Sequence, residues 1–400
     1  MAAAILRKGW CPGALRPMRS GDGLIVRVRP RAGRLGLDAA CVLADLAARL
    51  GNGHIDLTRR ANLQIRGLAE DRLDGLQSEL DRLGLLDDDT ESEAVRNVMV
   101  APLAGSDVHR MAMRLEELLV TDRRLRALPA KFGVLVDGDG PVSIVGERAD
   151  IALRAIDGAF ALGLDKTDGT QWLGACAADA TIDLVRTAML TFLDCRSQGR
   201  MRDLGGAAFS TVRSALISKL APLPSFDTSS RHKLGLLEGA VGVAAPFGRL
   251  EAHQLRQLVE LAAAAEVRDL HLSPWRAIYM CVRDTKSGQE VLDGARTIGL
   301  IAEDGDPLLR IEACPGMPDC ESSTVDTRGD ARRLAARGLK GSVHVSGCEK
   351  GCARSAPSSL VLVGDQGRYR VIHNGTTRDP AERMVRHEDI GGLLVEQTDG

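Results

Sequence analysis

The sequence predicts an α+β protein that contains two copies of one half-domain and, after them, a module that binds a metal centre. Three observations support this prediction. The chain has 400 residues, of which 44% are hydrophobic and 26% charged, a globular composition with room for two to four domains. A pattern of strands and helices near the N-terminus returns in the third quarter of the chain. Two close pairs of cysteines lie near the C-terminus.

The first copy of the half-domain begins at residues 23–29, where β-branched residues predict a strand. Residues 37–50 follow with apolar side chains at helical spacing, and this pattern stops at Gly51. Two more strands and a second helix come next, at residues 54–58, about 59–66 and 71–83. This order of strand, helix, strand, strand and helix is typical of a ferredoxin-like half-domain.

The segment from residue 96 to about 223 predicts a separate unit of helices and strands. We expect a helix at 108–119, a turn into a strand at 128–136, a hairpin through 142–145, and helices at about 178–195 and 206–220. Residues 222–230 have the composition of a linker. The similarity of this segment to residues 300–400 is too weak to identify the two as copies.

The second copy of the half-domain is expected to have strands at 239–245 and 269–273 and a helix at 250–265. When Ile55-Asp-Leu-Thr58 is aligned with Leu270-His-Leu-Ser273, the following loops stay in register and Arg60 aligns with Trp275. A repeat of this length indicates the duplication of a whole half-domain. Two such halves packed about a pseudo-two-fold axis would form a cleft between them.

The last hundred residues are expected to hold a helix at 330–337, a strand at 342–345 and a hairpin at 359–371. Together these patterns divide the chain into four units. They are a first ferredoxin-like half-domain at 1–88, an α/β domain without a cluster at 89–225, a second half-domain at 226–297 and a cluster domain at 298–400.

The two cysteine pairs predict a metal centre. Cys314 and Cys320 have five residues between them, and Cys348 and Cys352 have three. Gly and Pro surround both pairs, so the backbone is expected to form turns there. Thiolates are soft ligands that select zinc, copper or iron–sulfur centres. The first gap is wider than the spacing usual in zinc sites, which favours a 4Fe-4S cluster over structural zinc or buried free thiols.

Charge and composition argue against several classes of function. The formal net charge is −2, so no bulk attraction to nucleic acid or to a membrane surface is expected. No apolar run approaches the roughly 18 residues that a membrane-spanning helix needs. The first ten residues are too poor in apolar side chains for a signal peptide. We therefore expect a cytoplasmic protein whose cysteines are reduced.

Together with the cysteine pairs, two further motifs give nearly the whole chain a resemblance to the nitrite and sulfite reductase superfamily. Residues 57–67, Leu-Thr-Arg-Arg-Ala-Asn-Leu-Gln-Ile-Arg-Gly, resemble the family's Thr-Arg-x-x-x-Gln loop at the macrocycle site. Arg96-Asn-Val98 and Leu128-Pro-Ala-Lys-Phe132 resemble two anion-binding elements of those reductases. The resemblance implies sulfite-reductase-type iron–sulfur domains beside the duplicated half-domains.

Within this superfamily the chain resembles the precorrin-3B synthases in particular. Residues 11–18 (Cys-Pro-Gly-Ala-Leu-Arg-Pro-Met), 273–277 (Ser-Pro-Trp-Arg-Ala) and 346–352 (Ser-Gly-Cys-Glu-Lys-Gly-Cys) are similar to motifs of that family. Two departures from the reductases agree with this resemblance. Gly133 stands where those enzymes have a second lysine, and Glu349-Lys350 replaces their usual Pro-Asn. A site that reduces a small anion needs its cations, so the loss of one disfavours sulfite as the substrate.

The resemblance implies a monooxygenase of aerobic cobalamin biosynthesis. Such an enzyme converts precorrin-3A to precorrin-3B with dioxygen, placing a hydroxyl group on a meso carbon and closing a γ-lactone. The implied cofactors are the 4Fe-4S cluster and a mononuclear non-haem iron, whose ligands do not stand out among the eight histidines. Sirohaem is not expected, because the macrocycle at its position would be the substrate. No Gly-x-Gly-x-x-Gly follows a strand, so electrons from NADH are expected to arrive through a separate reductase or a ferredoxin.

Seven side chains on the motifs that resemble macrocycle-facing loops are candidates for binding the carboxylates of the substrate. They are Arg59, Arg60, Gln64, Arg66, Arg96, Lys131 and Arg276. Arginine suits this role because its guanidinium group can donate two hydrogen bonds to one carboxylate. The simpler interpretation is that these residues are solvated surface charges or ordinary turn and edge residues. The sequence assigns no catalytic residue.

Two other functions remain open from the sequence. A sirohaem-dependent nitrite or sulfite reductase would share the fold and the cluster, but Gly133 and the short chain count against it. An iron–sulfur electron carrier or sensor would need neither the duplication nor a cationic cleft. A sirohaem absorption band would favour the first of these, and a lack of affinity for any tetrapyrrole would favour the second.

Overall fold

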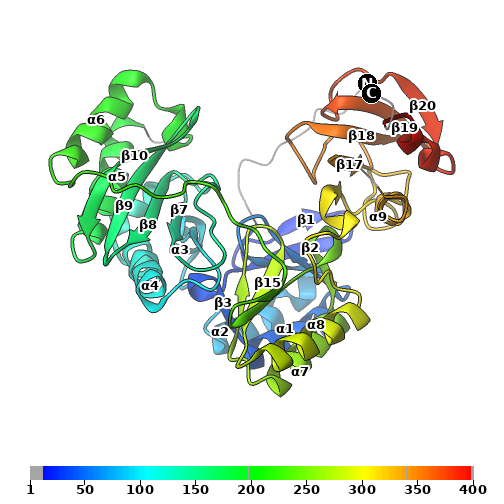
Figure 1. The fold of residues 1–400 in the computed structure, drawn as a ribbon, viewed down its shortest axis with the longest axis horizontal. Coiled ribbons are helices and arrows are strands. Elements are labelled where there is room, and N and C mark those ends of the chain that lie inside the picture. Colours follow the sequence, from blue (N-terminus) through cyan, green and yellow to red (C-terminus); the bar gives the residue numbers. More distant parts are fainter. Residues whose placement is uncertain (1–11, 197, 339–340, 398–400) are drawn as a thin grey trace.

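The computed structural model of the chain describes residues 12–196, 198–338 and 341–397, so Cys11 lies outside the described residues. Within these ranges the strands form four sheets of five strands each. Figure 1 shows two α/β modules on either side of, and above, a central pair of half-domains. The mixture of separate helices, antiparallel strands and short parallel segments confirms the predicted α+β class. No helix in the described part of the chain is long and apolar enough to cross a membrane.

The first half-domain follows the order that the sequence predicts. Its elements are β1 (Met18–Ser20), β2 (Gly23–Val28), α1 (Leu37–Leu50), β4 (His54–Leu57), β5 (Leu63–Leu68) and α2 (Leu73–Arg82). Helix α1 buries Leu43, Leu46 and Ala47 in the hydrophobic core. It ends at Gly51, whose N–H donates to the carbonyl of Ala47.

The second half-domain repeats this order. Its elements are β11 (Gly235–Leu237), β12 (Ala240–Ala244), α7 (Ala252–Ala264), β14 (Asp269–Leu272), β15 (Ala277–Cys281) and α8 (Thr285–Thr297). The loops before β5 and β15 agree in backbone detail, because Ala61 and Arg276 both have positive φ, of 53° and 62°. Their N–H groups donate to the carbonyls of Thr58 and Ser273, respectively. The alignment of Arg60 with Trp275 therefore holds in the structure.

A strand exchange joins the two half-domains, and the sequence patterns do not predict it. Strand β3 (Arg34–Gly36), from the first half, pairs with β14 in the sheet of the second half. Strand β13 (Arg249–Glu251), from the second half, pairs with β4 in the sheet of the first half. Each exchanged strand has three residues, too few for a periodic pattern to reveal.

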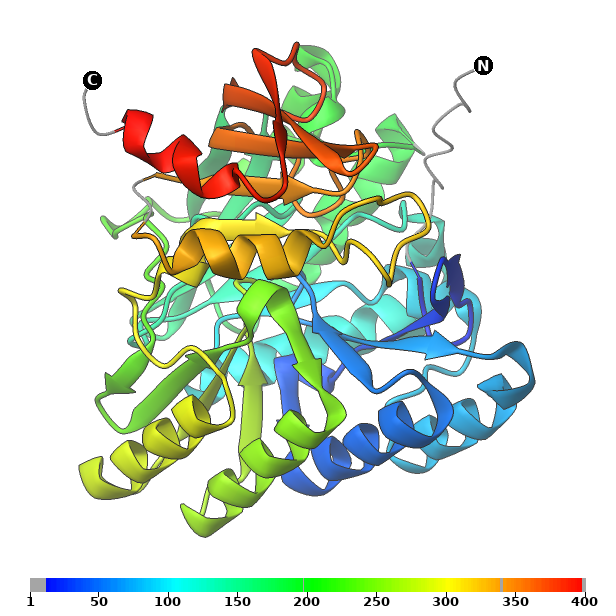
Figure 2. The same cartoon turned by 90° about the vertical axis from the view of Figure 1, so that its right-hand side faces the viewer.

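One hydrophobic core runs through both half-domains, with α1 packed against α7. Figure 2 shows the helices of both halves together at the bottom of the molecule, on the side away from the C-terminal strands. The division of the chain at residues 88, 225 and 297 stays a prediction.

The two α/β modules share one topology. The strands of the middle module are β6 (Val98–Val100), β7 (Val134–Asp137), β8 (Ile151–Ile156), β9 (Ala159–Lys166) and β10 (Gly169–Ala177). The strands of the C-terminal module are β16 (Ile311–Ala313), β17 (Val343–Ser346), β18 (Ser358–Asp365), β19 (Arg368–Gly375) and β20 (Arg383–Arg386). In each sheet the first three strands are parallel and the last two are antiparallel. Helices α4 (Ser106–Thr121) and α9 (Thr327–Ala335) occupy the same place, between the first and second strands. The sequence similarity between these two modules is too weak to identify them as copies, but their strand topology is the same.

One prediction for the middle module was wrong. Residues 142–145 do not form a hairpin with β7; Ser143 instead makes a single bridge to Arg231. The antiparallel strands of this module are β8, β9 and β10, which the sequence analysis did not assign. Helices α5 (Thr181–Cys195) and α6 (Gly206–Ile217) agree with the predicted ranges, and α3 (Thr90–Val95) precedes β6.

The two half-domain sheets differ on the face that is turned away from their helices. Strand pairing sets a row of four residues across the first sheet, Arg27, Gln64, Asp56 and Arg249. The equivalent row across the second sheet is Gly242, Tyr279, His271 and Arg34. Only the exchanged arginine is the same in both, so the duplicated halves present different chemistry on one scaffold.

Candidate cluster and substrate site

Two neighbouring strands of the C-terminal module bring the cysteine pairs together. Cys314 directly follows β16, and Cys348 lies just beyond the end of β17. The two strands are adjacent and parallel, so their loops leave the same edge of the sheet. Cys320 and Cys352 lie further along the same two loops.

The thiols of Cys348 and Cys352 both lie near those of the other cysteine pair. Desolvation raises the pKa of Cys348, and the nearby Cys314 and Cys320 thiols add to the rise, although a hydrogen bond from the backbone N–H of Lys350 opposes it. Desolvation of its thiol also raises the pKa of Cys352, with further contributions from Cys314, Cys348 and Cys320. The convergence of the two pairs that the sequence predicts is therefore present in the fold.

The four cysteines are free thiols. Within the described ranges, no three His, Cys, Asp or Glu side chains are close enough together to hold a single metal ion. Four cysteines that bind a 4Fe-4S cluster surround a larger group than the four that bind one zinc. Four thiolates on two neighbouring loops are the donor set that a 4Fe-4S cluster takes. The described residues also give no ligand set for a mononuclear iron.

The loop after β17 depends on glycine at residue 347. The N–H of Gly347 donates to the Sγ of Cys314 at 3.1 Å, which links the second cysteine loop to the first. A Cβ at residue 347 would lie only 2.2 Å from the Oγ of Ser323. That hydroxyl is itself fixed, because it donates to the carbonyl of Val325 at 2.9 Å. No larger residue fits without moving one of the cysteine loops.

A cavity of about 790 Å³, here called the arginine cavity, lies between the first half-domain and the middle module. Its basic lining residues are Arg29, Arg59, Arg60, Arg96, Lys131, Arg148 and Arg200. Several of these residues have carboxylate partners within the protein, among them Arg148, which pairs with Asp165 at 2.9 Å, and Arg200, which pairs with Asp150 at 2.8 Å.

A second cavity, of about 730 Å³, here called the apolar cavity, lies beside the second half-domain. Its apolar lining residues are Ala244, Ala245, Phe247, Trp275, Ile301, Leu308, Leu309 and Ile311. The two cavities adjoin, because Arg59 lines both of them. In addition, Trp275 donates from Nε1 to Glu147 of the arginine cavity at 2.9 Å. One elongated or planar ligand could therefore contact both.

The adjoining cavities are connected to the cysteine loops through Glu312. This residue belongs to β16, lines the apolar cavity and lies close in sequence to Cys314. Its Oε1 accepts hydrogen bonds from Arg59 and, at 2.7 Å, from Arg354. Burial disfavours the charged carboxylate, but these arginines outweigh burial and hold the pKa of Glu312 below its ordinary value. Arg59 thus joins the two cavities to the strand that carries Cys314.

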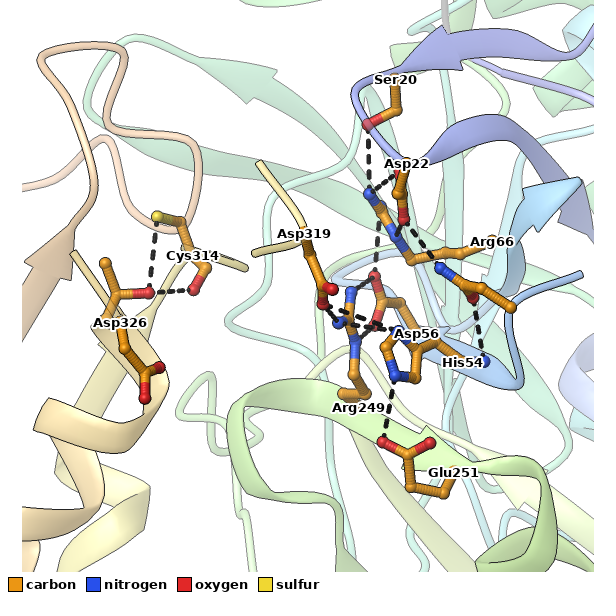
Figure 3. A network of polar contacts seen from close by, with 12 residues as sticks. Ser20, Asp22, His54, Asp56, Arg66, Arg249, Glu251, Cys314, Asp319 and Asp326 are labelled. Carbon is orange, nitrogen blue, oxygen red and sulfur yellow. Dashed lines mark hydrogen bonds and ion pairs between the residues drawn. The ribbon is translucent and has the colours of Figure 1, made fainter. Parts of the chain in front are cut away.

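A second set of polar contacts joins the first half-domain to the loop of Cys320 (Figure 3). Arg249, on the exchanged strand β13, binds Asp56 at 2.8 Å and also binds Asp319, the residue before Cys320. His54 lies 3.1 Å from the same guanidinium group. Burial disfavours the charge of Asp56, but Arg249 and other nearby arginines outweigh burial and hold its pKa below the ordinary value. The strand exchange thus helps to position a cysteine loop.

The structure brings four of the seven predicted substrate-binding residues to the cavities in accessible positions. Arg59, Arg60 and Lys131 line the arginine cavity, and Arg59 and Arg276 line the apolar cavity. Arg60 donates to the carbonyl of Lys131 at 3.2 Å, which connects two of the predicted motifs. Their contact with a substrate stays a prediction.

The other three predicted residues are placed differently. Arg96 lines the arginine cavity, but its side chain is 1% exposed and binds both oxygens of Asp87, at 2.6 and 2.9 Å. Arg66 binds both oxygens of Asp22 at 2.8 Å (Figure 3), and neither Arg66 nor Gln64 lines either cavity. Arg66 already has a carboxylate partner within the protein, and its contact with a substrate stays a prediction.

Sequence reasoning also missed residues of the site. Arg29 lines the arginine cavity, and the signal for it was present, since Arg27 and Arg29 alternate with valine in the first predicted strand. Glu312 lines the apolar cavity without any sequence signal beyond its nearness to Cys314. Its role depends on Arg59 and Arg354, which come from distant parts of the chain.

Comparison with known proteins places these features in context. Residues 16–83 match the model of the nitrite/sulfite reductase ferredoxin-like half domain. The chain is 31% identical to a precorrin-3B synthase of a Sinorhizobium species, over 98% of this chain and 88% of that protein. It is 23% identical to the ferredoxin–nitrite reductase of Synechococcus elongatus, over 90% of this chain and 80% of that protein.

A solved structure has the same fold. The NirA protein of Mycobacterium tuberculosis superposes with a TM-score of 0.71, covering 92% of this chain and 79% of that one. Its sequence identity is 19%, so the likeness concerns the fold alone.

Proposed function

The chain belongs to the precorrin-3B synthase family, within the nitrite and sulfite reductases, and we propose that it is an oxygen-dependent monooxygenase that converts precorrin-3A to precorrin-3B. In this reaction one atom of dioxygen enters the product and the other leaves as water. Two electrons come from an external donor, NADH through a reductase or a ferredoxin, and two protons are taken up from solvent. The product carries a new hydroxyl group on a meso carbon and a γ-lactone closed by a neighbouring acetate.

The observation that carries this proposal is the 31% identity to a precorrin-3B synthase along almost the whole chain. The residues that line the arginine cavity favour the proposed monooxygenase over an enzyme that reduces a small anion. Gly133 lines that cavity at the position where the reductases have a second lysine. Arg96, Arg148 and Arg200 have carboxylate partners within the protein, so much of the positive charge is already compensated.

The adjoining cavities suit a tetrapyrrole that carries carboxylates on its rim. The apolar cavity offers Phe247 and Trp275 to the plane of a macrocycle. Arg59, Arg60 and Lys131 offer donors to carboxylates at its edge. In the proposed complex these residues bind and orient the substrate.

The four cysteines would hold a 4Fe-4S cluster, which when bound would supply single electrons to the neighbouring cleft. The protein's own contribution is the path from the cysteine loops to the substrate. Glu312, fixed by Arg59 and Arg354, lies between them and is kept ionised by those arginines. The same contact positions Arg59 for a substrate carboxylate.

The proposal is tested with protein purified without oxygen and with its cluster intact. Visible and spin-resonance spectra are recorded before and after precorrin-3A is added, and turnover is then started with ¹⁸O₂ and a reduced ferredoxin. We expect a cluster signal without a sirohaem band, a change in that signal on substrate binding, and a product that contains one ¹⁸O atom.

Two results would contradict the proposal. A sirohaem band together with reduction of nitrite or sulfite would identify a reductase. A cluster signal that precorrin-3A leaves unchanged, with no product formed, would identify an electron carrier or a sensor instead.

A further inference from the structure

Lys350 carries a positive charge between the last two cysteines and is tied to the loop of the first two. It lies two residues after Cys348 and two residues before Cys352. Its Nζ donates a hydrogen bond to the Oγ of Ser322 at 2.9 Å. Ser322 follows Cys320 by two residues, so this contact spans the two cysteine loops. The partner is a neutral hydroxyl group, which leaves the charge of the ammonium group uncompensated.

The carboxylate next to Lys350 does not cancel this charge, because the fold holds it elsewhere. Glu349 pairs with Arg370 of β19 at 2.9 Å. The carbonyl of Glu349 accepts a hydrogen bond from the hydroxyl of Thr377 at 2.9 Å, which fixes the backbone of the turn as well. The two opposite charges of this turn are therefore separated. Glu349 is bound toward the hairpin of β19, and Lys350 is bound toward the first cysteine loop.

The charge of Lys350 acts on the thiols on both sides of it. Burial raises the pKa of Cys348 and of Cys352, the other cysteine thiols add to the rise, and the charge of Lys350 opposes it for both. The backbone N–H of Lys350 also donates to the Cys348 thiol. The side chain and the backbone of one residue thus both favour negative charge on sulfur.

Such a residue is placed to affect the reduction of a 4Fe-4S cluster. Reduction adds one electron to a centre that its four thiolates already make negative. The net charge near the sulfur atoms and the hydrogen bonds to them are among the factors that set the reduction potential of these clusters. A nearby cation lowers the free energy of the reduced form more than that of the oxidised form, because the reduced form is more negative.

We propose that Lys350, held in place by Ser322, raises the reduction potential of the cluster and so determines how easily the external donor reduces it. This inference rests on the proposed function only through the presence of the cluster. In the step concerned, the donor loses one electron and the cluster gains it, and Lys350 keeps its proton. Each turnover of the proposed reaction needs two electrons, so this step occurs twice. Lys350 is a positioning residue that acts on the cluster and not on the substrate.

The size of the effect is limited by solvent. The side chain of Lys350 is exposed, and water and salt weaken the interaction of exposed charges. We expect the charge to change the equilibrium constant for reduction by roughly threefold to tenfold, which corresponds to about 30–60 mV for a one-electron couple.

The experiment measures the reduction potential of the cluster in the full-length protein, purified without oxygen, by a redox titration followed by spin resonance. Iron and acid-labile sulfide are determined first, so that only variants with a full cluster are compared. Lys350→Gln should have a potential lower than the wild type by the amount given above. Lys350→Arg keeps the charge and should titrate like the wild type. The matched control is Glu321→Gln, which removes an exposed charge of opposite sign beside Cys320 and should not lower the potential.

Two further measurements separate the charge from a change in the shape of the loop. The difference between the wild type and Lys350→Gln should shrink as the salt concentration rises, since salt screens a charge and does not screen an altered loop. Ser322→Ala keeps every charge but frees the ammonium group, and its potential should lie between those of the other two proteins. This variant also provides the test if Lys350→Gln loses its cluster.

Several outcomes would overturn the inference while the proposed function stands. They are an unchanged potential in Lys350→Gln, an equal fall in Lys350→Arg or Glu321→Gln, a difference that salt does not reduce, and a Ser322→Ala variant that titrates like the wild type. Conversion of precorrin-3A by the wild type is measured separately and does not depend on any of them. A wild type that contains no 4Fe-4S cluster would remove both the inference and the cluster of the proposed function.

Discussion

Arg59 and Arg96 belong to the same predicted set and line the same cavity, but their surroundings give them different roles. Arg59 has a side chain that is 59% exposed and one carboxylate partner, Glu312. Arg96 is almost fully buried and is held by Asp87 and Glu116. Sequence resemblance could place both at the site, because each lies in a recognisable motif. It could not reveal which of them already had a partner, since Asp87 and Glu116 lie outside those motifs.

Substitution should separate these two roles. Arg59→Gln is expected to weaken the binding of uroporphyrin III, a stable tetrapyrrole with eight carboxylates, roughly tenfold or more in a fluorescence titration, because it removes an accessible donor to carboxylates. Its urea unfolding should change less than that of Arg96→Gln, because Glu312 keeps Arg354 as a partner at 2.7 Å. Arg96→Gln is expected to lower the free energy of unfolding by about 3–5 kcal/mol, since it leaves buried carboxylates without their cation. Equal stability losses in the two variants would show that this distinction is wrong.

His271 gives the fold a defined response to acid. It is buried in β14, its Nδ1 accepts a hydrogen bond from the N–H of Leu103 at 3.2 Å, and burial lowers its pKa to about 4. The unfolded chain binds a proton near pH 6.5, so between this pH and pH 4 it holds a proton that the folded chain does not. The stabilising effect of the neutral imidazole is complete above pH 6.5 and is lost as the pH falls toward 4.

Urea unfolding at pH 7, 6 and 5 measures this effect. The free energy of unfolding should fall by up to about 1.4 kcal/mol per pH unit from this residue alone. His271→Gln should reduce the slope by up to that amount. His253→Gln, at an exposed histidine of α7, should keep the slope of the wild type. If His271→Gln has an unchanged slope, the acid response arises elsewhere.

At the scale of elements, the sequence could predict the helices and strands whose hydrophobic periodicity extends over enough residues. Helices α1, α5 and α7 and most strands of the half-domains agree with the predicted ranges, because their apolar periodicity extends over several turns or residues. Strands β3 and β13 could not be predicted, since three residues carry no period and their partners lie in the other half. The strands β8 to β10 were missed for a different reason: their Gly-rich and Ala-rich composition is a weak strand signal.

The loop after β17 offers a test of how the cysteine pairs are held together. Gly347→Ala should force the loop away from Ser323 and break the hydrogen bond from residue 347 to the Sγ of Cys314. We expect the variant to lose iron and acid-labile sulfide several-fold faster in the presence of a chelator. Gly305→Ala, where a Cβ would meet nothing within 4 Å, is the control and should retain its cluster like the wild type. Equal retention by the two variants would rule out this role of Gly347.

At the scale of the whole molecule, we expect the exchange of β3 and β13 to make the two half-domains unfold as one cooperative unit. Leu250, at the centre of β13, is fully buried in the core that both halves share. Leu250→Ala should cost about 2–5 kcal/mol of unfolding free energy through the cavity that it leaves. Because the strand lies in the sheet of the other half, hydrogen exchange should accelerate in α1 and in α7 alike.

Leu362→Ala is the matched control for this prediction. Leu362 is equally buried, but it belongs to β18 in the core of the C-terminal module. It should accelerate exchange in that module and leave α1 and α7 protected. If Leu250→Ala accelerates exchange in only one half-domain, the halves unfold separately despite the exchanged strands.

The strand exchange also has a consequence for how the protein is made. While the chain emerges from the ribosome, the first half-domain lacks the strand that covers the edge of β4, because β13 lies far downstream. An uncovered strand edge is a site for wrong pairing with other chains. Synthesis of the middle module between the two halves prolongs this period. The growing chain is therefore most vulnerable to aggregation before residue 251 leaves the exit tunnel, and chaperones that bind nascent chains should be needed most during that interval.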